Sequence, residues 1–434
     1  MRDATGYIAG PPLGFGGFPT MSQPSVTDVL RATAGRPRLV VSRSALRHNV
    51  RLLRDATGPE SSFCAVVKAD AYGHGAAAVV DALCDAFDDP NLPNPAVDWL
   101  AVATIGEALK LPDHDVPVMV LRPVECVYLG ENRHELEAAV RRGITLSLAT
   151  VSAADDVARV AERLGVRARV QVMLDTGMNR EMCEPRHFAE LLDAVSRRPA
   201  LELVATGTHF TDGEAGDELP HNDEQCRQLL DLLDEAAATP GGTNHDRLRV
   251  HVANSGGILG SGRTAATAGE GVFDLVRGGL ALYGIDPCDP PSNPGLRPAA
   301  KWTAPLLLAR DLAPGQSVGY GRTWTASKPI RLGTIPVGYA DGYQRILSNK
   351  SVVRIPAPEG ENDAFCPLVG RVSMDYITVD LTSAPWIKVG DEITLVDNDP
   401  ASPCSAANLA KVAETIPYEI LCGIGRRVTR VYVD

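Results

Sequence analysis

Lys68 stands at the end of the apolar run 65–67 and is followed by Ala-Asp-Ala-Tyr-Gly-His-Gly. Apolar surroundings disfavour the ammonium form and lower the pKa of a lysine. A neutral amine is the nucleophile that forms a Schiff base with an aldehyde cofactor. A lysine after a strand is more often a solvated surface residue, so this interpretation depends on the neighbouring residues. Tyr72 lies four residues on, at the start of an expected helix, and Gly73 and Gly75 free the backbone there.

Short β-branched runs alternate with amphipathic segments from about residue 37 onward. Eight runs read as strands: 63–68, 99–103, 116–121, 144–149, 168–174, 201–206, 248–252 and 273–276. Helical periodicity lies between most of them, at 74–86, 153–164, 185–197 and 223–238. Eight strands, each followed by a crossover, predict a (β/α)₈ barrel, and a doubly wound sheet is the alternative.

Polar residues gather where the predicted strands stop. Catalytic residues of such barrels lie at the carboxyl ends of strands or in the loops that follow. The candidates are Lys68 and Tyr72, the segment 175–180, His209, Asn254 and Ser255, and the segment 277–279. Glycine at 278 and 279 allows backbone N–H groups to approach an anion, which makes a phosphate site a better interpretation than a simple turn.

The sequence pattern changes near Asn293, within the linker-like run P-P-S-N-P-G. Beyond it come alternating runs at 303–308, 330–337, 351–355, 376–380, 392–396 and 428–433, and only 406–413 looks helical. We therefore expect a flexible N-terminal extension at 1–36, the barrel at 37–293 and a mainly β domain at 294–434.

The bulk composition narrows the class of protein. A net charge of -12 argues against a nucleic-acid partner. The nine cysteines form no C-x-x-C pair, so a metal site or redox couple has little support, and reduced thiols suit the cytoplasm. No run approaches the roughly 20 apolar residues that span a bilayer, so we expect no membrane partner.

Eight ordered motifs carry a resemblance to a known family. V-V-K-A-D-A-Y-G-H-G at 66–75 looks like the cofactor-lysine signature of alanine racemases, the fold-type III pyridoxal phosphate enzymes. Further matches follow in family order, covering about residues 37–433: D-T-G-M-N-R at 175–180, G-T-H-F at 207–210, H-V-A-N-S at 251–255, V-R-G-G-L-A-L-Y-G at 276–284, V-G-Y-G-R-T-W at 318–324, I-P-V-G-Y-A-D-G-Y at 335–343 and V-G-R-V-S-M-D at 369–375.

The resemblance implies pyridoxal 5'-phosphate as the cofactor and assigns residues to it. Lys68 would bind the aldehyde, Arg277 would reach the pyridine nitrogen, and His209 would lie beside Arg277. The remaining cofactor residues implied are Tyr72, Asn254, Ser255, Gly279, Leu280 and Arg426. Because an arginine keeps its proton, the pyridine nitrogen would stay largely unprotonated, which limits transamination as a side reaction.

The resemblance also implies a two-base interconversion of L-alanine and D-alanine. Racemisation needs a base on each face of a planar carbanion-like centre. Lys68 is one base, and Tyr320, activated by way of Arg277 and His209, is the other. In the family the second domain reaches the cofactor of the partner subunit, which implies a homodimer with shared active sites. Arg180, Met374, Asp375 and Tyr339 would bind or surround the substrate.

Four positions depart from the family pattern. Met173 stands where many members carry a lysine that braces the substrate arginine, and Met182 replaces a usual glycine. Ser42 replaces a usual acidic residue, and Arg426 stands where better-studied members have a tyrosine at the phosphate and the entrance. These changes leave open a broader or shifted specificity that includes serine.

Two alternative functions remain beside that of a racemase. An amino-acid decarboxylase of the same fold type would share the barrel and the β domain. The sequence lacks the cysteine-centred motif of those enzymes, and they have no need of Tyr320. A non-catalytic pyridoxal phosphate carrier is the alternative of another class, but such proteins are single barrels without a second domain.

Overall fold

A computed structural model describes residues 35–59, 61–85, 92–124, 133–212, 220–238, 248–260, 273–288 and 295–434. The expected N-terminal extension lies almost wholly outside the described residues, as do Cys126 and nearly all of the linker run at 290–295.

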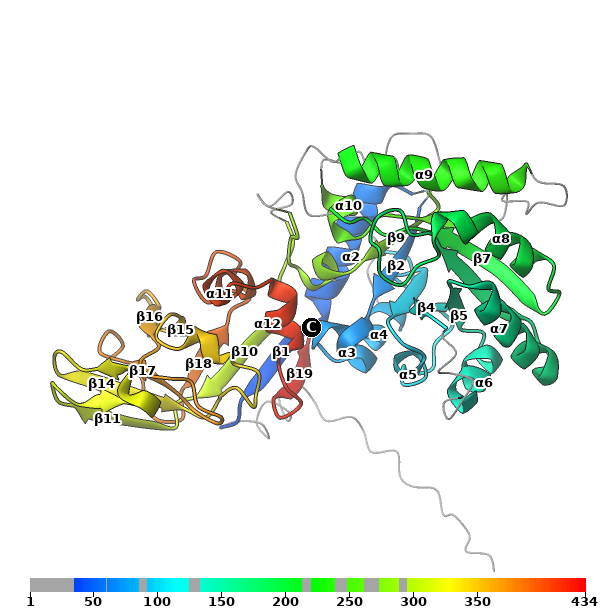
Figure 1. The fold of residues 1–434 in the computed structure, drawn as a ribbon. Coiled ribbons are helices and arrows are strands. Elements are labelled where there is room, and N and C mark those ends of the chain that lie inside the picture. The colour runs from blue at the N-terminus through cyan, green and yellow to red at the C-terminus, as the bar shows by residue number, and fades with distance from the viewer. Residues whose placement is uncertain are drawn as a thin grey trace, which may run out of the picture.

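Eight parallel strands close into a barrel, in which the last strand pairs with the first through Ala65 and Gly278 (Figure 1). The strands are β2 (Ser62–Val66), β3 (Trp99–Val102), β4 (Val118–Pro123), β5 (Thr145–Leu148), β6 (Ala168–Met173), β7 (Leu201–Gly207), β8 (Arg249–His251) and β9 (Leu275–Gly278). Their near-continuous apolar runs are buried on both faces, as expected for a parallel sheet covered by helices. The predicted barrel is confirmed.

Helices surround the barrel and connect its strands. They are α2 (Arg43–Thr57), α4 (Ala76–Cys84), α5 (Ile105–Ala108), α6 (Arg133–Arg141), α7 (Val151–Leu164), α8 (Pro185–Ser196), α9 (Pro220–Ala237) and α10 (Ser255–Leu259). In α7, the Thr150 side chain caps the first turn by accepting from the Ala153 N–H at 3.1 Å, and Gly165 ends the helix at φ 67°. Local capping signals therefore set the bounds of this helix.

The second domain is built on a six-stranded sheet of order β16-β15-β18-β10-β1-β19. Its strands are β16 (Ala364–Pro367), β15 (Val352–Ile355), β18 (Glu392–Val396), β10 (Ala300–Pro305), β1 (Arg38–Ser42) and β19 (Thr429–Val433). Three further strands, β11 (Leu308–Leu312), β14 (Ile330–Ile335) and β17 (Ile377–Asp380), form a second sheet, and β12 (Ser317–Val318) pairs with β13 (Trp324–Thr325). The expected β-rich domain is confirmed.

Two separate parts of the chain form this second domain. β1, near the start of the described chain, pairs antiparallel with β10 and parallel with β19, and α2 then leads into the barrel (Figure 1). Apolar residues of both parts belong to one continuous buried cluster. The two domains therefore share a core, in which second-domain residues can support barrel segments.

The second domain contains more helix than the periodicity predicts. The expected helix at 406–413 is present as α11 (Ala406–Ala413), but α12 (Pro417–Cys422) follows it. The expectation of a single helix was wrong because α12 is too short to show a full helical period. Single 3₁₀ turns occur at η2 (Leu280–Tyr283), η3 (Tyr320–Arg322) and η4 (Arg345–Leu347).

Two features are absent from the described residues. No helix in that part of the chain has the length and apolarity needed to cross a bilayer. No group of three or more metal-ligating side chains occurs among the same residues.

Candidate active site

A cavity of about 510 Å³ opens at the carboxyl end of the barrel strands. Four predicted site residues line it, and the remaining lining residues were not assigned a direct role from the sequence. The predicted residues are Lys68, Arg180, His209 and Arg277, and the others are Ala103, Leu121, Arg122, Pro123, Met173, Glu181 and Met182. The topology thus brings together side chains from strands that are far apart in the sequence.

The segment that carries Lys68 has an unusual backbone. β2 ends at Val66, and the five residues of α3 (Lys68–Tyr72) follow, of which 69–72 have φ between 53° and 55°. This is a left-handed turn of four non-glycine residues, a conformation that costs about 1–2 kcal/mol per residue. The expectation that Tyr72 starts an ordinary helix was therefore wrong, and α4 begins only at Ala76. Strain at such a position persists only where the surroundings hold it.

Glu107 holds the first part of this turn. Its Oε1 accepts from the Ala69 N–H at 2.8 Å, and its Oε2 accepts from the N–H groups of Ala103 at 2.8 Å and Thr104 at 3.1 Å. Glu107 also completes the capping box of α5 with Thr104. The role of Glu107 was not predicted from the sequence, although the T-x-x-E signal after strand 99–103 was present.

The second domain holds the other end of the turn. Nε and Nη2 of Arg430 donate to the Gly73 carbonyl at 3.1 and 3.0 Å, and the Tyr432 hydroxyl donates to the His74 carbonyl at 3.1 Å. A Cβ on Gly73 would lie 2.3 Å from the Leu421 carbonyl oxygen, so only glycine fits there. The position of Lys68 therefore depends on both domains.

Replacing Glu107 with alanine is expected to lower the free energy of unfolding by about 1–3 kcal/mol, because three backbone N–H groups lose a charged acceptor. Chemical denaturation of the full chain measures this change. Glu162→Ala on α7 is the matched control, since Glu162 is exposed, and it should change stability by less than about 0.5 kcal/mol. Equal stability of the two variants would contradict the role of Glu107.

The surroundings of Lys68 favour its neutral form. Burial lowers the pKa of its ammonium group, and the positive charges of Arg180 and Arg277 lower it further. Glu107 acts in the opposite direction but more weakly. The amine is therefore more available as a nucleophile or base than that of an exposed lysine.

Arg277 and His209 form a hydrogen-bonded pair on one wall of the cavity. Nη2 of Arg277 donates to Nδ1 of His209 at 3.1 Å and to the Thr208 carbonyl at 2.9 Å. Burial, Arg277 and Lys68 together lower the pKa of His209 to about 3. Because the guanidinium can only donate, His209 is a neutral imidazole that carries its proton on Nε2.

A series of hydrogen bonds between buried polar side chains holds Arg277 in place. Nη1 of Arg277 donates to Nδ1 of His251, whose Nε2 lies 2.9 Å from Oε1 of Gln171. Nε2 of Gln171 then donates to Oγ of Ser147 at 2.8 Å, and Ser147 donates to the Val120 carbonyl at 2.6 Å. Each donor meets an acceptor, so the hydrogen-bonding groups of this series are all paired inside the barrel. His251 belongs to a motif quoted from the sequence, but its role there was not foreseen.

The loops after β8 and β9 meet at one oxygen atom. Oγ of Ser255 accepts from the N–H groups of Gly279 at 2.8 Å and Ala281 at 3.2 Å, and Asn254 caps α10 through Gly257. A Cβ on Gly279 would lie 2.8 Å from the Tyr72 hydroxyl and 3.7 Å from Oγ of Ser255. Tyr72, Ser255 and the Gly279–Leu280 backbone therefore lie close together, and this group, the N–H cradle, offers donors of the kind that bind an anionic oxygen.

Arg180 is held by its neighbour. Its guanidinium pairs with the Glu181 carboxylate, which raises the pKa of Arg180. The loop before it is organised by Asp175, whose carboxylate accepts from the N–H groups of Gly177, Asn179 and Arg180. Met173 lies buried at the end of β6 and offers no charge. Arg180 therefore has a carboxylate partner from its own loop, which was not predicted from the sequence.

The predicted site residues of the second domain do not line the Lys68 cavity. Tyr320, Tyr339, Met374, Asp375 and Arg426 are all absent from the described lining of the Lys68 cavity. Tyr320 is 74% exposed and Met374 is 52% exposed. Asp375 accepts from Arg427 at 2.8 Å, and the Met374 carbonyl accepts from the Ala340 N–H at 3.0 Å. These five residues therefore form no part of the wall of the Lys68 cavity in the described chain.

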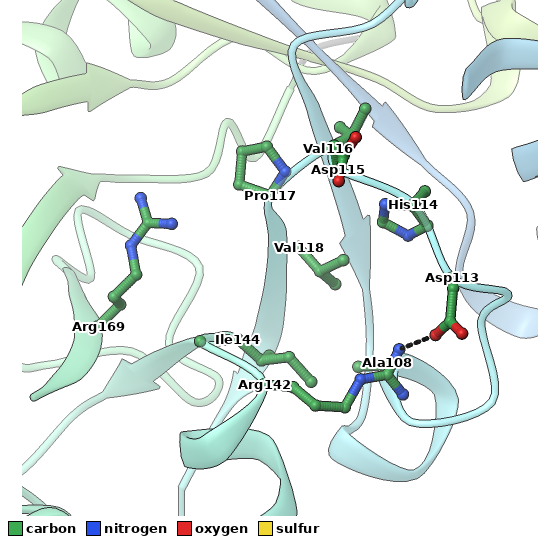
Figure 2. Close-up of a pocket in the computed structure, with 11 residues that line it drawn as sticks. Ala108, Asp113, His114, Asp115, Val116, Pro117, Val118, Arg142, Ile144 and Arg169 are labelled. Atoms are coloured by element: carbon green, nitrogen blue, oxygen red, sulfur yellow. Dashed lines mark ion pairs between the residues drawn. The ribbon is translucent and has the colours of Figure 1, made fainter. Parts of the chain in front are cut away.

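A larger cavity, of about 650 Å³, lies at the opposite end of the barrel, where strands β4, β5 and β6 begin. Figure 2 shows Arg142 turned toward Asp113, with which it pairs at 3.8 Å. Arg169, on β6, lies on another side of the cavity. None of the predicted site residues lines it. We favour the Lys68 cavity as the active site because barrel enzymes carry their chemistry at the carboxyl end of the strands.

Comparisons with known proteins agree with the resemblance seen in the sequence. Residues 41–287 match the family described as "Alanine racemase, N-terminal domain", and residues 299–432 match "Alanine racemase, C-terminal domain". The alanine racemase of Cutibacterium acnes is 33% identical over 91% of this chain and 97% of its own length. That of Symbiobacterium thermophilum is 34% identical over 90% and 96%.

Solved structures show the same architecture. The alanine racemase of Streptomyces coelicolor A3(2) superposes with a TM-score of 0.76 at 31% identity, covering 93% of this chain and all of that one. The alanine racemase of Bartonella henselae, described with covalently bound pyridoxal phosphate, gives 0.74 at 29% identity over 92% and 99% of the two chains.

Proposed function

The chain belongs to the alanine racemase family of amino-acid racemases, and from this premise we propose that it interconverts L-alanine and D-alanine with pyridoxal 5'-phosphate. The observation that carries the proposal is the cavity in which the amine of Lys68 lies with Arg180, His209 and Arg277. A lysine with a lowered pKa, the buried Arg277 and a neutral histidine suit this chemistry.

The residues of the cavity fit this cofactor. The amine of Lys68 would bind the aldehyde carbon, and Arg277 would face the pyridine nitrogen. The N–H cradle would hold the phosphate, since a Cβ at Gly279 would fill the space between Tyr72 and Ser255. When bound, pyridoxal phosphate withdraws electrons from the α-carbon of the substrate and so acidifies its C–H bond.

Within this arrangement the chain's own side chains position the substrate and move its proton. Arg180 would bind the carboxylate of the amino acid, because a guanidinium matches its two oxygens, and Glu181 would hold Arg180. Lys68 would take or return the α-proton on one face. The neutral His209 would accept from Arg277, and Arg277 would donate to the pyridine nitrogen without giving up its proton. This would limit the spread of negative charge into the ring and so favour racemisation over side reactions.

The second base would be Tyr320 of the partner subunit. Tyr320 is exposed, and the described lining of the Lys68 cavity comes from the barrel alone. Tyr339, Met374 and Asp375 share the same domain and would approach the partner's cavity together with Tyr320. We therefore propose a homodimer in which each active site uses both chains, and a cytoplasmic location that suits the free thiols found in the described part of the chain.

The decisive experiment is the formation of D-alanine from L-alanine by the purified full chain with pyridoxal phosphate. A panel of L-amino acids at equal concentration tests the second candidate, a racemase that also accepts serine, which the exposed Arg426 and the methionines at 173 and 182 favour. Alanine faster than every other substrate by about 100-fold, or 2.7 kcal/mol in transition-state binding, would exclude the broader specificity. Absence of racemisation with retained cofactor would favour a non-catalytic carrier.

The rate of cofactor uptake is expected to rise with pH through the pKa of Lys68, because only the neutral amine attacks an aldehyde. This pKa is lowered by burial, Arg180 and Arg277, so the rise should occur below the pH at which an exposed lysine titrates. Arg180→Met removes one of the two positive charges, which raises the pKa of Lys68 and moves the profile to higher pH. Stopped-flow absorbance measures the profile. The exposed Arg186→Met is the control, and a shift to lower pH in Arg180→Met would contradict the assignment.

Gly279→Ala is expected to weaken binding of pyridoxal phosphate by about 10- to 100-fold, since one lost charge-assisted contact is worth roughly 1.5–3 kcal/mol. The new Cβ would lie 2.8 Å from the Tyr72 hydroxyl and so occupy the N–H cradle. Fluorescence titration measures the affinity, and circular dichroism checks the fold. Gly106→Ala in α5 is the control, because its Cβ would meet nothing closer than 3.7 Å. An unchanged affinity for Gly279→Ala would place the phosphate elsewhere.

A further inference from the structure

The cavity where β4, β5 and β6 begin, the amino-end cavity, is larger than the Lys68 cavity. Its volume of about 650 Å³ lies within the range of small-molecule sites. In the described chain the two cavities share no lining residue. Figure 2 shows Arg169 on one side of the amino-end cavity and the Arg142–Asp113 pair on another. The half-buried Pro117 and Val118 add apolar surface. The cavity therefore combines cations with an apolar wall.

Arg169 reaches this cavity from the inner face of the barrel. Along β6 it lies two residues before Gln171 and four before Met173, and alternate residues of a strand share a face. Gln171 donates to Ser147 inside the barrel, and Met173 lines the Lys68 cavity. Arg169 therefore belongs to the same inward face at the other end of the strand. Its guanidinium carbon lies 5.3 Å from the centre of the Trp99 ring, so this ring covers one side of the cation.

The N–H groups of Arg169 lack an acceptor. Among the described residues, its side chain makes no hydrogen bond or ion pair and has the Trp99 ring as its charge-related contact. None of its nitrogen atoms is both buried and unpaired, so these atoms are accessible from the cavity that Arg169 lines. A guanidinium presents its donors in a planar fork that matches the two oxygens of a carboxylate. Arg169 is therefore a half-buried cation whose donors are free to bind an anion.

The other titratable residues of the lining restrict the charge of that anion. They are Asp113, His114, Asp115 and Arg142. Burial lowers the pKa of His114, so its imidazole is neutral at neutral pH. Asp113 and Asp115 are exposed, and Asp113 lies 3.8 Å from Arg142, which is longer than a hydrogen bond. Because the two carboxylates offset the two guanidiniums, the lining favours an anion with a single charge over a dianion.

We propose that the amino-end cavity binds a small monocarboxylate with an apolar body, such as an aromatic carboxylic acid. The carboxylate would accept hydrogen bonds from the free fork of Arg169, and the apolar body would pack on Pro117 and Val118. This site is separate from Arg180, to which the substrate carboxylate is assigned, because Arg180 lines the cavity at the other end of the barrel.

The test uses the full chain saturated with pyridoxal phosphate, its tryptophans labelled with fluorine, and three probes. Benzoate, benzamide and terephthalate are flat rings that carry one negative charge, none and two. The ¹⁹F resonance of Trp99, assigned by its loss in Trp99→Phe, reports on the cavity because Arg169 lies over this ring. Benzoate should shift this resonance and bind at least about 10-fold more tightly than benzamide, as expected for charge-assisted hydrogen bonds. It should also bind more tightly than terephthalate.

Variants of three arginines complete the test. Arg169→Met should weaken the binding of benzoate by at least about 10-fold, and Arg169→Gln serves the same purpose if the methionine prevents folding. Arg186→Met, at an exposed arginine of α8, is the matched control and should bind benzoate as the parent does. In Arg180→Met the response of Trp99 to benzoate should persist, which separates this site from the Lys68 cavity.

Three results would overturn the proposal. They are equal affinities for benzoate and benzamide, an unchanged affinity for benzoate in both Arg169 variants, and loss of the Trp99 response in Arg180→Met. Tighter binding of terephthalate than of benzoate would contradict the single charge assigned to the ligand. None of these measurements depends on racemase activity, so the proposed function and this site can fail independently.

Discussion

Replacing Lys68 with alanine is expected to lower the rate of racemisation by at least about 1,000-fold in both directions, because one group serves as nucleophile and as base. The cavity places this amine beside Arg180 and Arg277, where its pKa is lowered, and no other lysine lines that cavity within the described chain. Racemisation assays from L-alanine and from D-alanine measure the loss.

Two further readouts separate chemistry from folding. Borohydride reduction followed by mass spectrometry should attach the cofactor at Lys68 in the parent chain and leave the variant unmodified at this position. Lys110→Ala is the matched control, since Lys110 is an exposed lysine that follows α5 and does not line the Lys68 cavity. If the Lys68 variant kept more than about one hundredth of the activity, the two roles given to this amine would be wrong.

Tyr320→Phe is expected to retain pyridoxal phosphate and lose at least about 100-fold in racemisation, which is the scale of a missing general base. Lys68 would still act on one face of the α-carbon. In D₂O the variant should therefore exchange the α-hydrogen of one enantiomer of alanine without inverting it. Tyr376→Phe, which removes a hydroxyl from another exposed tyrosine of the same domain, is the control.

Subunit mixing tests whether Tyr320 acts across a dimer. Chains carrying Lys68→Ala and chains carrying Tyr320→Phe are both nearly inactive alone. Random association puts half of the dimers in mixed form, and each mixed dimer contains one complete site, so activity should recover to about one quarter of the parent value. No recovery in verified mixed dimers would mean that both bases come from one chain.

The sequence predicted much of the fold because its signals are local. The alternation of β-branched runs with amphipathic helices was sufficient for the barrel, and Gly165 and Thr150 mark the ends of α7 in the sequence itself. Strand ends in a parallel barrel meet at one face. Lys68, Arg180, His209 and Arg277 could therefore be grouped from their positions alone, and they do line one cavity.

Other features could not be read from the sequence, because they depend on contacts between distant segments. Nothing local indicates that β1 pairs with β10 and β19 in the second domain. The left-handed turn at 69–72 contradicts the helical preference of Ala-Asp-Ala-Tyr, and it persists because Glu107 and Arg430 bind its backbone from two domains. The series of side-chain hydrogen bonds from Arg277 to Ser147 likewise forms only when strands β5, β6, β8 and β9 close into a barrel.

The sequence by itself therefore determined which side chains reach the carboxyl end of the barrel, since strand period and chain order fix that outcome. Only the tertiary structure decided how they are held and charged. Burial next to Arg180 and Arg277 lowers the pKa of Lys68, and burial next to Arg277 and Lys68 lowers the pKa of His209. These are through-space effects, because desolvation and charge depend on distance after folding and not on separation along the chain.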